Sequence, residues 1–317
     1  MGEGGVPIID LHEFPGQYEK LRRACVEWGC FRIVNHSISS TLMADMKRVV
    51  GSLLDLPFDV KNRNIDVIAG SGYMAPSKVN PLYEALGLYD IGSSQAVETF
   101  CAQLDASPYQ SFQLGINKLT DGREVIEMYA KAIHGGAMDI ARKLAESMGL
   151  NGNLFESWIS QFRINKYSFT PETVGSSGVQ IHTDSGFLTI LQDDENVGGL
   201  EVMDPSGVYI AVDPSPGTLL VNLGDIATVI TEFLHLAWSN GRLRNVKHRV
   251  QCKESTIRIS IASFLVGPRD EVEAPPELVD SEHPRLYVSF TYEDYRKLRL
   301  TTKLPAGEAL ELKRIQS

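Results

Sequence analysis

The chain has 317 residues, of which 43% are hydrophobic and 22% charged, and its formal net charge at pH 7 is -10. A chain of this length can bury a sizeable core, whereas its negative charge would repel a phosphate backbone. We therefore expect a globular protein with no nucleic-acid partner. No apolar run reaches the ~18 residues that span a bilayer, so we expect no membrane partner. The four cysteines form no CxxC pair and are too sparse for a disulfide framework, which predicts free thiols and a cytoplasmic location.

The N-terminal part alternates strand and helix patterns. Residues 6–11 and 30–35 are short apolar runs that predict strands. Between them, residues 18–28 repeat apolar side chains at three- and four-residue steps, which predicts a helix. Ser39 or Ser40 can cap a second helix before another apolar, helix-like repeat.

The next region, residues 64–108, loses periodicity and gathers glycine, proline, serine and tyrosine. We expect a long loop with short strands here, and its aromatic side chains favour part of a binding site over a plain linker. A long amphipathic helix is then expected over residues 121–148. We divide the chain into an N-terminal region, residues 1–110, and a second region, residues 111–317, with a core at about 160–270.

Short apolar or alternating runs, separated by turn residues, fill most of the second region. They are residues 161–168, 179–184, 187–192, 200–203, 209–212, 218–223, 246–252 and 257–266. So many short strands after a helical first half predict an α+β protein that is mainly β. The expected architecture is an antiparallel jelly roll flanked by helices, with a mixed N-terminal region.

The sequence His182-Thr183-Asp184 falls at the end of one predicted strand. Because successive side chains of a strand alternate faces, His182 and Asp184 project from the same side. A second histidine from a distant strand, such as His248, would complete two imidazoles and one carboxylate. That set holds non-haem Fe(II) and leaves coordination positions open. One HxD motif is weak evidence by itself, and the two residues could instead form a hydrogen-bonding pair at a strand end.

Alternation in the last predicted strand separates an aliphatic face from a polar one. Ile257, Ile259, Ile261 and Leu265 share one face, and Arg258, Ser260, Ala262 and Phe264 share the other. Arg163, Asn165 and Tyr167 share a face of the first predicted strand in the same way. If the aliphatic face packs on the helices, Arg258 lines the barrel interior, where a buried guanidinium requires an anion.

Several motifs along the chain point to one family. They are residues 6–11 and 28–36, His182-Thr183-Asp184, residues 239–242, His248-Arg249-Val250 and Arg258-Ile259-Ser260. Together they resemble the plant Fe(II)/2-oxoglutarate-dependent dioxygenases over nearly the whole chain. The resemblance implies a double-stranded β-helix, a distorted jelly roll, with iron bound by His182, Asp184 and His248. It also implies O2 as a reactant and 2-oxoglutarate held at its distal carboxylate by Arg258 and Ser260, assisted by Tyr167 and Asn165.

Within that family the sequence is most similar to the dioxygenases that oxidise the auxin indole-3-acetic acid to 2-oxindole-3-acetic acid, with release of succinate and CO2. The resemblance rests on residues 70–73, 80–84, 100–101, 161–167, 182–192 and 238–252. A flat indole needs aromatic walls, and its carboxylate needs a cation or hydroxyl. The candidates for substrate binding are Tyr73, Phe100, Arg163, Phe187 and Phe264. Core packing is the alternative role of each aromatic, above all of Phe187 and Phe264.

Two other functions stay open at this stage, as does the oligomeric state. One is a dioxygenase of the same fold acting on another small plant metabolite, such as a gibberellin, a flavonoid or a glucosinolate side chain. The other is a jelly-roll binding protein that keeps metal and anion sites without turnover. Iron-dependent succinate production would separate this last function from the enzymes.

One segment departs from the family pattern. Between Asp225 and Ser239 the family usually has a shorter connection, whereas residues Thr228 to Ala237 extend it here. The extra segment lies on the approach to His248, and we expect it to bulge outward and leave the iron site intact. His235 inside it is not expected to be a ligand.

Overall fold

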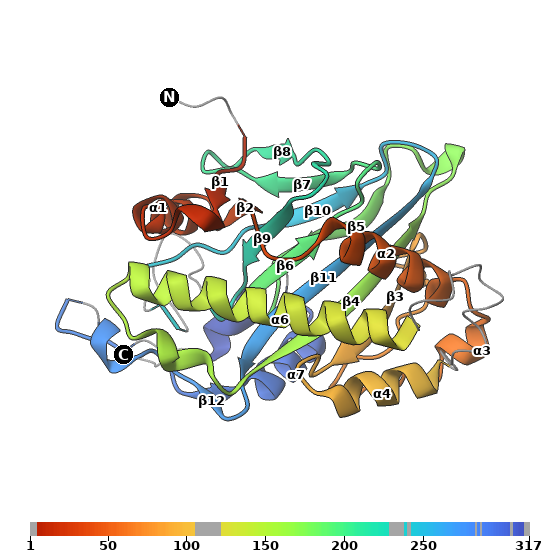
Figure 1. Ribbon diagram of the computed structural model, residues 1–317. Coiled ribbons are helices and arrows are strands. Elements are labelled where there is room, and N and C mark those ends of the chain that lie inside the picture. The colour runs from red at the N-terminus through yellow and green to blue at the C-terminus, as the bar shows by residue number, and fades with distance from the viewer. Residues whose placement is uncertain are drawn as a thin grey trace.

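The computed structural model describes residues 5–104, 122–227, 238–239, 242–282, 284–285, 287–304 and 307–313. Within them two β-sheets face each other, and helices cover the larger sheet (Figure 1). The helices are α1 (Tyr18–Glu27), α2 (Ser40–Leu54), α3 (Phe58–Lys61), α4 (Ser94–Gln103), α6 (Gly122–Ser147) and α7 (Tyr292–Thr302). The strands are β1 (Ile8–Asp10), β2 (Cys30–Val34), β3 (Tyr83–Tyr89), β4 (Trp158–Ser168), β5 (Ser177–His182), β6 (Leu188–Gln192), β7 (Leu200–Met203), β8 (Tyr209–Ala211), β9 (Leu219–Leu223), β10 (His248–Gln251), β11 (Ile257–Pro268), β12 (Glu271–Val272) and β13 (Phe290–Thr291).

The larger sheet has seven strands in the order β1-β2-β9-β6-β11-β4-β3, and the facing sheet has four in the order β5-β10-β7-β8. The β1–β2 pair is parallel, and the other pairs of both sheets are antiparallel. This confirms the mainly β, antiparallel jelly roll. The larger sheet joins β1, β2 and β3 to strands of the second region, and the division at residues 110 and 111 stays a prediction.

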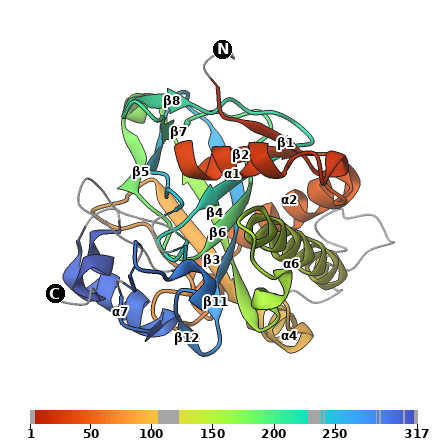
Figure 2. The same cartoon turned by 90° about the vertical axis from the view of Figure 1, so that its left-hand side faces the viewer.

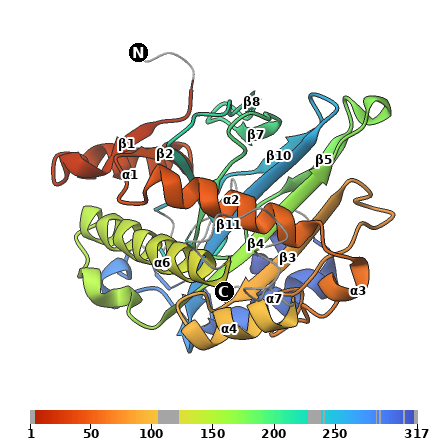
Figure 3. The ribbon, with the colours of Figure 1, turned by 45° about the vertical axis from the view of Figure 1, so that its right-hand side comes forward.

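Helices α2 and α6 lie together across one face of the larger sheet, and α7 lies on the other side of the molecule (Figures 2 and 3). On β11, Ile261 and Leu265 are buried in the core cluster that includes residues of α2 and α6. Arg258 and Ser260 point away from that cluster into the space between the sheets. The period-2 pattern therefore separates a core face from an interior polar face, although Ile257 at the strand end is 53% exposed.

The first elements agree with the sequence prediction. Ser39 caps α2 by accepting a hydrogen bond from the Leu42 backbone N–H at 3.2 Å. The predicted helix at residues 121–148 is α6, which buries one apolar face against α2 and the sheet. No helix among the described residues is long and apolar enough to cross a membrane.

The prediction of a long loop with short strands at residues 64–108 is correct only in part. Residues 83–89 form the short strand β3, which pairs along β4, whereas residues 94–103 form the helix α4, which was not expected. The Ser93 side chain accepts a hydrogen bond from the Ala96 backbone N–H, so this helix has a serine cap. Helix α7 is not anticipated by any pattern above. The segment Thr228 to Ala237 lies outside the described residues.

Candidate active site

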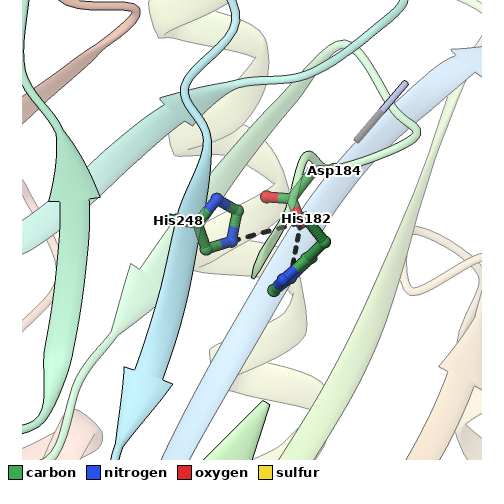
Figure 4. Close-up of side chains that lie close together, drawn as sticks. All are labelled: His182, Asp184 and His248. Carbon is green, nitrogen blue, oxygen red and sulfur yellow. Dashed lines mark ion pairs between the residues drawn. The ribbon is translucent and has the colours of Figure 1, made fainter. Parts of the chain in front are cut away.

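Two histidines and one aspartate converge between the sheets. His182 is the last residue of β5 and His248 the first of β10, and they are direct partners across these antiparallel strands. Their ring centroids are 4.2 Å apart. Asp184 lies beyond the end of β5, so the expectation that it shares a strand with His182 is wrong, yet its carboxylate still turns toward both rings (Figure 4).

The hydrogen bonds of the two imidazoles leave one nitrogen of each free to bind a metal. Nδ1 of His182 lies 2.8 Å from the Gln180 carbonyl oxygen, and Nδ1 of His248 lies 3.2 Å from that of Val246. A carbonyl only accepts, so Nδ1 carries the proton and Nε2 keeps its lone pair. The two Nε2 atoms are 3.9 and 3.7 Å from Asp184 Oδ1.

The donor set fits a divalent transition metal. The three ligand atoms of His182, Asp184 and His248 all lie within 4.8 Å of one another. Burial and the neighbouring His248 ring lower the pKa of His182 to about 4, so this imidazole is neutral near pH 7. Two neutral imidazoles and one carboxylate on one side of an ion are typical ligands of non-haem Fe(II).

Thr189 on β6 fixes the orientation of the Asp184 carboxylate. Its hydroxyl donates to Asp184 Oδ2 at 2.6 Å, and the bond is buried. Because Oδ2 is occupied, Oδ1 faces the two imidazoles. No sequence pattern gives Thr189 a role, because its contact with Asp184 depends on how the loop that carries Asp184 folds back onto β6.

We expect Thr189→Val, which replaces the hydroxyl by a methyl group, to weaken Fe(II) binding about 10-fold, because loss of a hydrogen bond to a metal ligand has effects of this size. Thr189→Ser keeps the hydroxyl and should bind Fe(II) nearly as the wild type does. Anaerobic Fe(II) titration of both variants measures the difference. Equal iron affinity of the two variants would show that this hydrogen bond does not position Asp184.

Asp225 links the metal site to the C-terminal helix. Its backbone N–H donates to the Asp184 carbonyl at 2.8 Å, and its fully buried carboxylate accepts from Asn245 Nδ2 at 3.0 Å and from the Tyr295 hydroxyl at 2.7 Å. Arg299 of α7 pairs with the same carboxylate and donates to the Thr183 carbonyl at 3.0 Å. Helix α7 therefore helps to fix the position of the backbone segment that carries Asp184.

A cavity of about 260 Å³ lies between the two sheets and contains the triad. Its lining comprises Met74, Asn80, Tyr83, Arg163, Asn165, Tyr167, Val179, His182, Asp184, Thr189, Leu191, Leu200, Asn222, His248, Val250, Arg258, Ser260, Ala262 and Phe264. The structure thus brings the three metal candidates, the four 2-oxoglutarate candidates and two of the five substrate candidates to one place. The volume suits small molecules.

Arg258 is the largest fully buried side chain of the described residues, and its guanidinium is only partly satisfied. It pairs with Asp193 through Nη2 and stands over the Tyr167 ring at 5.1 Å from the centroid. Its Nε and Nη1 atoms are buried and have no hydrogen-bond partner among the described residues. A buried guanidinium with unpaired donors fits the carboxylate of a bound anion.

Polar groups beside Arg258 form a short chain. The Tyr83 hydroxyl donates to Asn165 Oδ1 at 2.8 Å, and Asn165 Nδ2 donates to the Ser260 hydroxyl at 3.3 Å. The Tyr83 ring also packs on the Tyr167 ring with centroids 5.3 Å apart. Tyr83 was missed in the sequence because it falls in the segment expected to be a loop, whereas β3 places it opposite Tyr167.

Two of the substrate candidates, Phe264 and Arg163, line the cavity. The Arg163 guanidinium donates to the Gly72 carbonyl at 2.6 Å and also to the Gly70 carbonyl. Burial lowers its pKa. Among the described residues it forms no ion pair with a carboxylate; its hydrogen bonds go to backbone carbonyls, and the Asp66 carboxylate acts on its charge only from a longer distance.

The other three substrate candidates lie away from the cavity lining. The Tyr73 hydroxyl donates to Glu84 at 2.8 Å, and Phe100 is buried on α4 beside a separate pocket of about 410 Å³. Phe187 is fully buried in an aromatic cluster, with ring centroids 5.3, 5.0 and 5.0 Å from those of Phe155, Trp158 and Trp238. Phe187 therefore packs in the core, which was the alternative to a role in substrate binding.

Truncation separates the roles of two phenylalanines. Phe187→Ala should destabilise the fold by about 3–5 kcal/mol, because it leaves a void in a dense aromatic cluster, while the KM for the organic substrate stays unchanged. Phe264→Ala, at a cavity wall, should instead raise that KM. Chemical denaturation and steady-state kinetics on both variants provide the test. A KM raised by the Phe187 change alone would contradict this assignment.

Comparison with known proteins agrees with this site. The 2OG-Fe(II) oxygenase superfamily model matches residues 158–267, and a model described as the N-terminal region of non-haem dioxygenases in morphine synthesis matches residues 6–93. Together with a relative that is 50% identical over 96% of the chain, these matches show that the chain belongs to the 2OG-Fe(II) oxygenase superfamily. It is a 2-oxoglutarate-dependent dioxygenase, with Fe(II) as its cofactor and 2-oxoglutarate and O2 as cosubstrates.

Several of the similar proteins come from plants. The 2-oxoglutarate-dependent dioxygenase DAO of Oryza sativa subsp. japonica is 50% identical, covering 96% of this chain and 97% of that protein. The 2-oxoglutarate complex of dioxygenase for auxin oxidation 1 from Arabidopsis thaliana is 58% identical over 89% of this chain and all of that chain, with a TM-score of 0.80. The rice dioxygenase for auxin oxidation has 49% identity, a TM-score of 0.84, and coverage of 98% of this chain and 100% of that one.

Proposed function

We propose that this enzyme oxidises indole-3-acetic acid to 2-oxindole-3-acetic acid, while 2-oxoglutarate is converted to succinate and CO2. Two of the similar solved structures are named for auxin oxidation, and one of them is 58% identical to this chain. The observation that carries the proposal is the second buried arginine: Arg163 lines the same cavity as the triad and is free of any carboxylate partner among the described residues. An anionic substrate would compensate its charge.

We assign the Fe(II) ligands to His182, Asp184 and His248. Bound there, Fe(II) supplies the oxidation chemistry that no side chain can perform. The backbone carbonyls of Gln180 and Val246 accept the Nδ1 protons of the two imidazoles, which leaves the Nε2 lone pair of each ring for the metal. The protein also keeps the carboxylate turned to the metal through Thr189.

We assign 2-oxoglutarate to the end of the cavity at Arg258. The unpaired Nε and Nη1 donors would bind its distal carboxylate, and Ser260 would add a hydroxyl donor. The Tyr167 ring supports the guanidinium from below, and Asn165 links Ser260 to Tyr83. For the substrate we propose Arg163 as the carboxylate partner and Phe264 as an aromatic wall.

Another small plant metabolite is the alternative substrate. Gibberellin 2-beta-dioxygenase 6 of Oryza sativa subsp. japonica is 31% identical over 94% of this chain and 82% of that protein. That likeness is weaker than the likeness to the auxin-oxidising proteins. A binding protein without turnover is disfavoured, because the chain belongs to a family of dioxygenases.

Succinate formation tests the proposed reaction. Iron-loaded protein with 2-oxoglutarate and O2 should form succinate and 2-oxindole-3-acetic acid in equal amounts when indole-3-acetic acid is added. A gibberellin or a flavonoid should give little succinate above the rate without substrate. Equal or greater stimulation by either compound, or oxidation of indole-3-acetic acid at another carbon, would overturn the proposal.

We also propose a cytoplasmic location. All four cysteines are buried and none forms a disulfide, and burial raises the pKa of Cys30 to about 12. Unreactive thiols without disulfide partners support a reducing compartment. Cell fractionation of the tagged protein tests this location, and we expect the protein in the cytosolic fraction.

A further inference from the structure

Arg163, the proposed partner of the substrate carboxylate, rests on a loop. Its Nη1 donates to the Gly72 carbonyl at 2.6 Å, and its Nη2 donates to the Gly70 carbonyl. Both glycines lie outside the helices and strands, so no repeating backbone hydrogen bonds hold these two carbonyls in place. Other contacts of the loop must therefore set the position of the guanidinium.

Two features hold the loop close to Arg163. The Asp66 carboxylate accepts hydrogen bonds from the backbone N–H groups of Gly70 at 2.7 Å and Gly72 at 2.6 Å. The loop also packs on β3 at Gly87, which is the direct partner of Arg163 on β4. A Cβ atom at Gly87 would lie 1.7 Å from a backbone oxygen of the loop, so only glycine permits this close approach.

A second arginine, Arg296 of α7, holds the same loop. Its Nε donates to the Ala69 carbonyl, and its Nη2 donates to the Gly70 carbonyl at 2.5 Å. Its Nη1 donates to the Tyr292 hydroxyl at 3.1 Å, which ties the guanidinium to its own helix. The Gly70 carbonyl oxygen therefore accepts hydrogen bonds from both Arg296 and Arg163.

Arg296 does not line the catalytic cavity, so it can act on a bound substrate only through its charge or through the loop. A guanidinium binds a carboxylate through two parallel N–H groups, and a small shift in its position weakens both bonds. The contacts of Arg296 with the loop therefore bear directly on how tightly Arg163 can bind an anion.

We propose that Arg296 is a positioning residue, which fixes Arg163 through the Gly70 carbonyl for the carboxylate of the substrate. This inference rests on the proposed function. A change at Arg296 should weaken the binding of an anionic substrate and spare a neutral analogue. It should also spare 2-oxoglutarate, because the proposed partner of that molecule is Arg258.

Arg296→Lys separates the position of the guanidinium from its charge. Lysine keeps the positive charge, but a point charge on a flexible chain cannot hold the carbonyls of Ala69 and Gly70 in the fixed geometry of the planar fork. Indole-3-acetate and the neutral indole-3-acetamide are titrated anaerobically into protein loaded with Fe(II) and 2-oxoglutarate, and calorimetry gives each Kd. The Kd for indole-3-acetate should rise about 10-fold, and that for indole-3-acetamide should stay within about twofold of the wild-type value.

A double-mutant cycle shows whether the effect passes through Arg163. In an Arg163→Gln background, adding Arg296→Lys should change the Kd for indole-3-acetate by less than about twofold, because the group that Arg296 positions is gone. A rise of the same size in both backgrounds overturns the proposal. If Arg163→Gln fails to fold, the difference between the two ligands in Arg296→Lys alone decides.

The Kd for 2-oxoglutarate distinguishes positioning from general damage to the fold. It should be unchanged in Arg296→Lys, and Arg142→Lys on the exposed face of α6 is the matched control for all titrations. A raised Kd for 2-oxoglutarate, or equal weakening of both indole ligands, overturns the proposal.

The inference and the proposed function fail in different ways. An unchanged Kd for indole-3-acetate in Arg296→Lys overturns the inference alone, provided that the wild type still oxidises indole-3-acetate at C2. Failure of the wild-type protein to bind and oxidise indole-3-acetate overturns both.

Discussion

Asp184→Ala should reduce Fe(II) affinity by more than 100-fold and abolish succinate formation. Asp184 supplies the only carboxylate among the three described ligand candidates, and its Oδ1 lies 3.9 and 3.7 Å from the Nε2 atoms of His182 and His248. Loss of a hydrogen bond to a metal ligand typically costs 10- to 100-fold in affinity, so loss of the ligand itself should cost more. Anaerobic Fe(II) titration and metal analysis of the isolated protein measure the effect.

Two further variants separate metal binding from folding. Asp184→Asn keeps the shape and can still accept from Thr189, but it removes the negative charge, so its Fe(II) affinity should fall between those of the wild type and Asp184→Ala. Asp45→Ala, on the surface of α2, should bind iron normally. Iron affinity within about threefold of the wild type in Asp184→Ala would exclude this residue as a ligand.

Period-2 alternation predicted the parts of the site that stand on long strands. Arg258 and Ser260 on β11, and Asn165 and Tyr167 on β4, line the cavity, and the two strands pair with Arg258 opposite Tyr167. The alternation works because one face of each strand packs on the core, so the other must face the interior.

Residues outside long strands were predicted less well. The rule of alternating faces correctly predicted that Asp184 lies on the same side as His182. It did so for the wrong reason, because β5 ends at His182 and a loop positions Asp184. Phe100 was assigned to a substrate loop, yet it lies on α4, a helix whose serine cap was hidden in a segment rich in turn residues. Phe187 directly follows the motif region, but packing with Phe155 and Trp238 turns it away from the cavity.

Contacts between distant segments could not be read from local patterns. Strand register determines which residues lie beside Thr189, Asn222 and Tyr83. The packing of α7 brings Tyr295 and Arg299 to Asp225. Register and docking depend on the whole sheet, whereas a sequence pattern reports only which face of one strand is buried. The structure was needed to find the residues that support the metal ligands.

Arg258→Lys should raise the Kd for 2-oxoglutarate about 10- to 100-fold and leave Fe(II) affinity unchanged. The guanidinium can pair with Asp193 through Nη2 and still offer unpaired donors to a carboxylate. An ammonium group is a single point charge without the planar fork, so Asp193 and the cosubstrate would compete for it. Each charge-assisted hydrogen bond contributes about 1.5–3 kcal/mol, and 1.4 kcal/mol corresponds to a factor of ten.

Lysine is preferred to an apolar replacement because Asp193 is itself largely buried. Burial raises the pKa of Asp193, and the Arg258 charge opposes that shift. Removing the positive charge would leave this carboxylate unpaired and destabilise the fold. Anaerobic titration of iron-loaded protein with 2-oxoglutarate measures the Kd, and Arg142→Lys on the exposed face of α6 is the matched control. An unchanged Kd for 2-oxoglutarate in Arg258→Lys would refute this role, because it would show that the guanidinium does not bind the carboxylate of the cosubstrate.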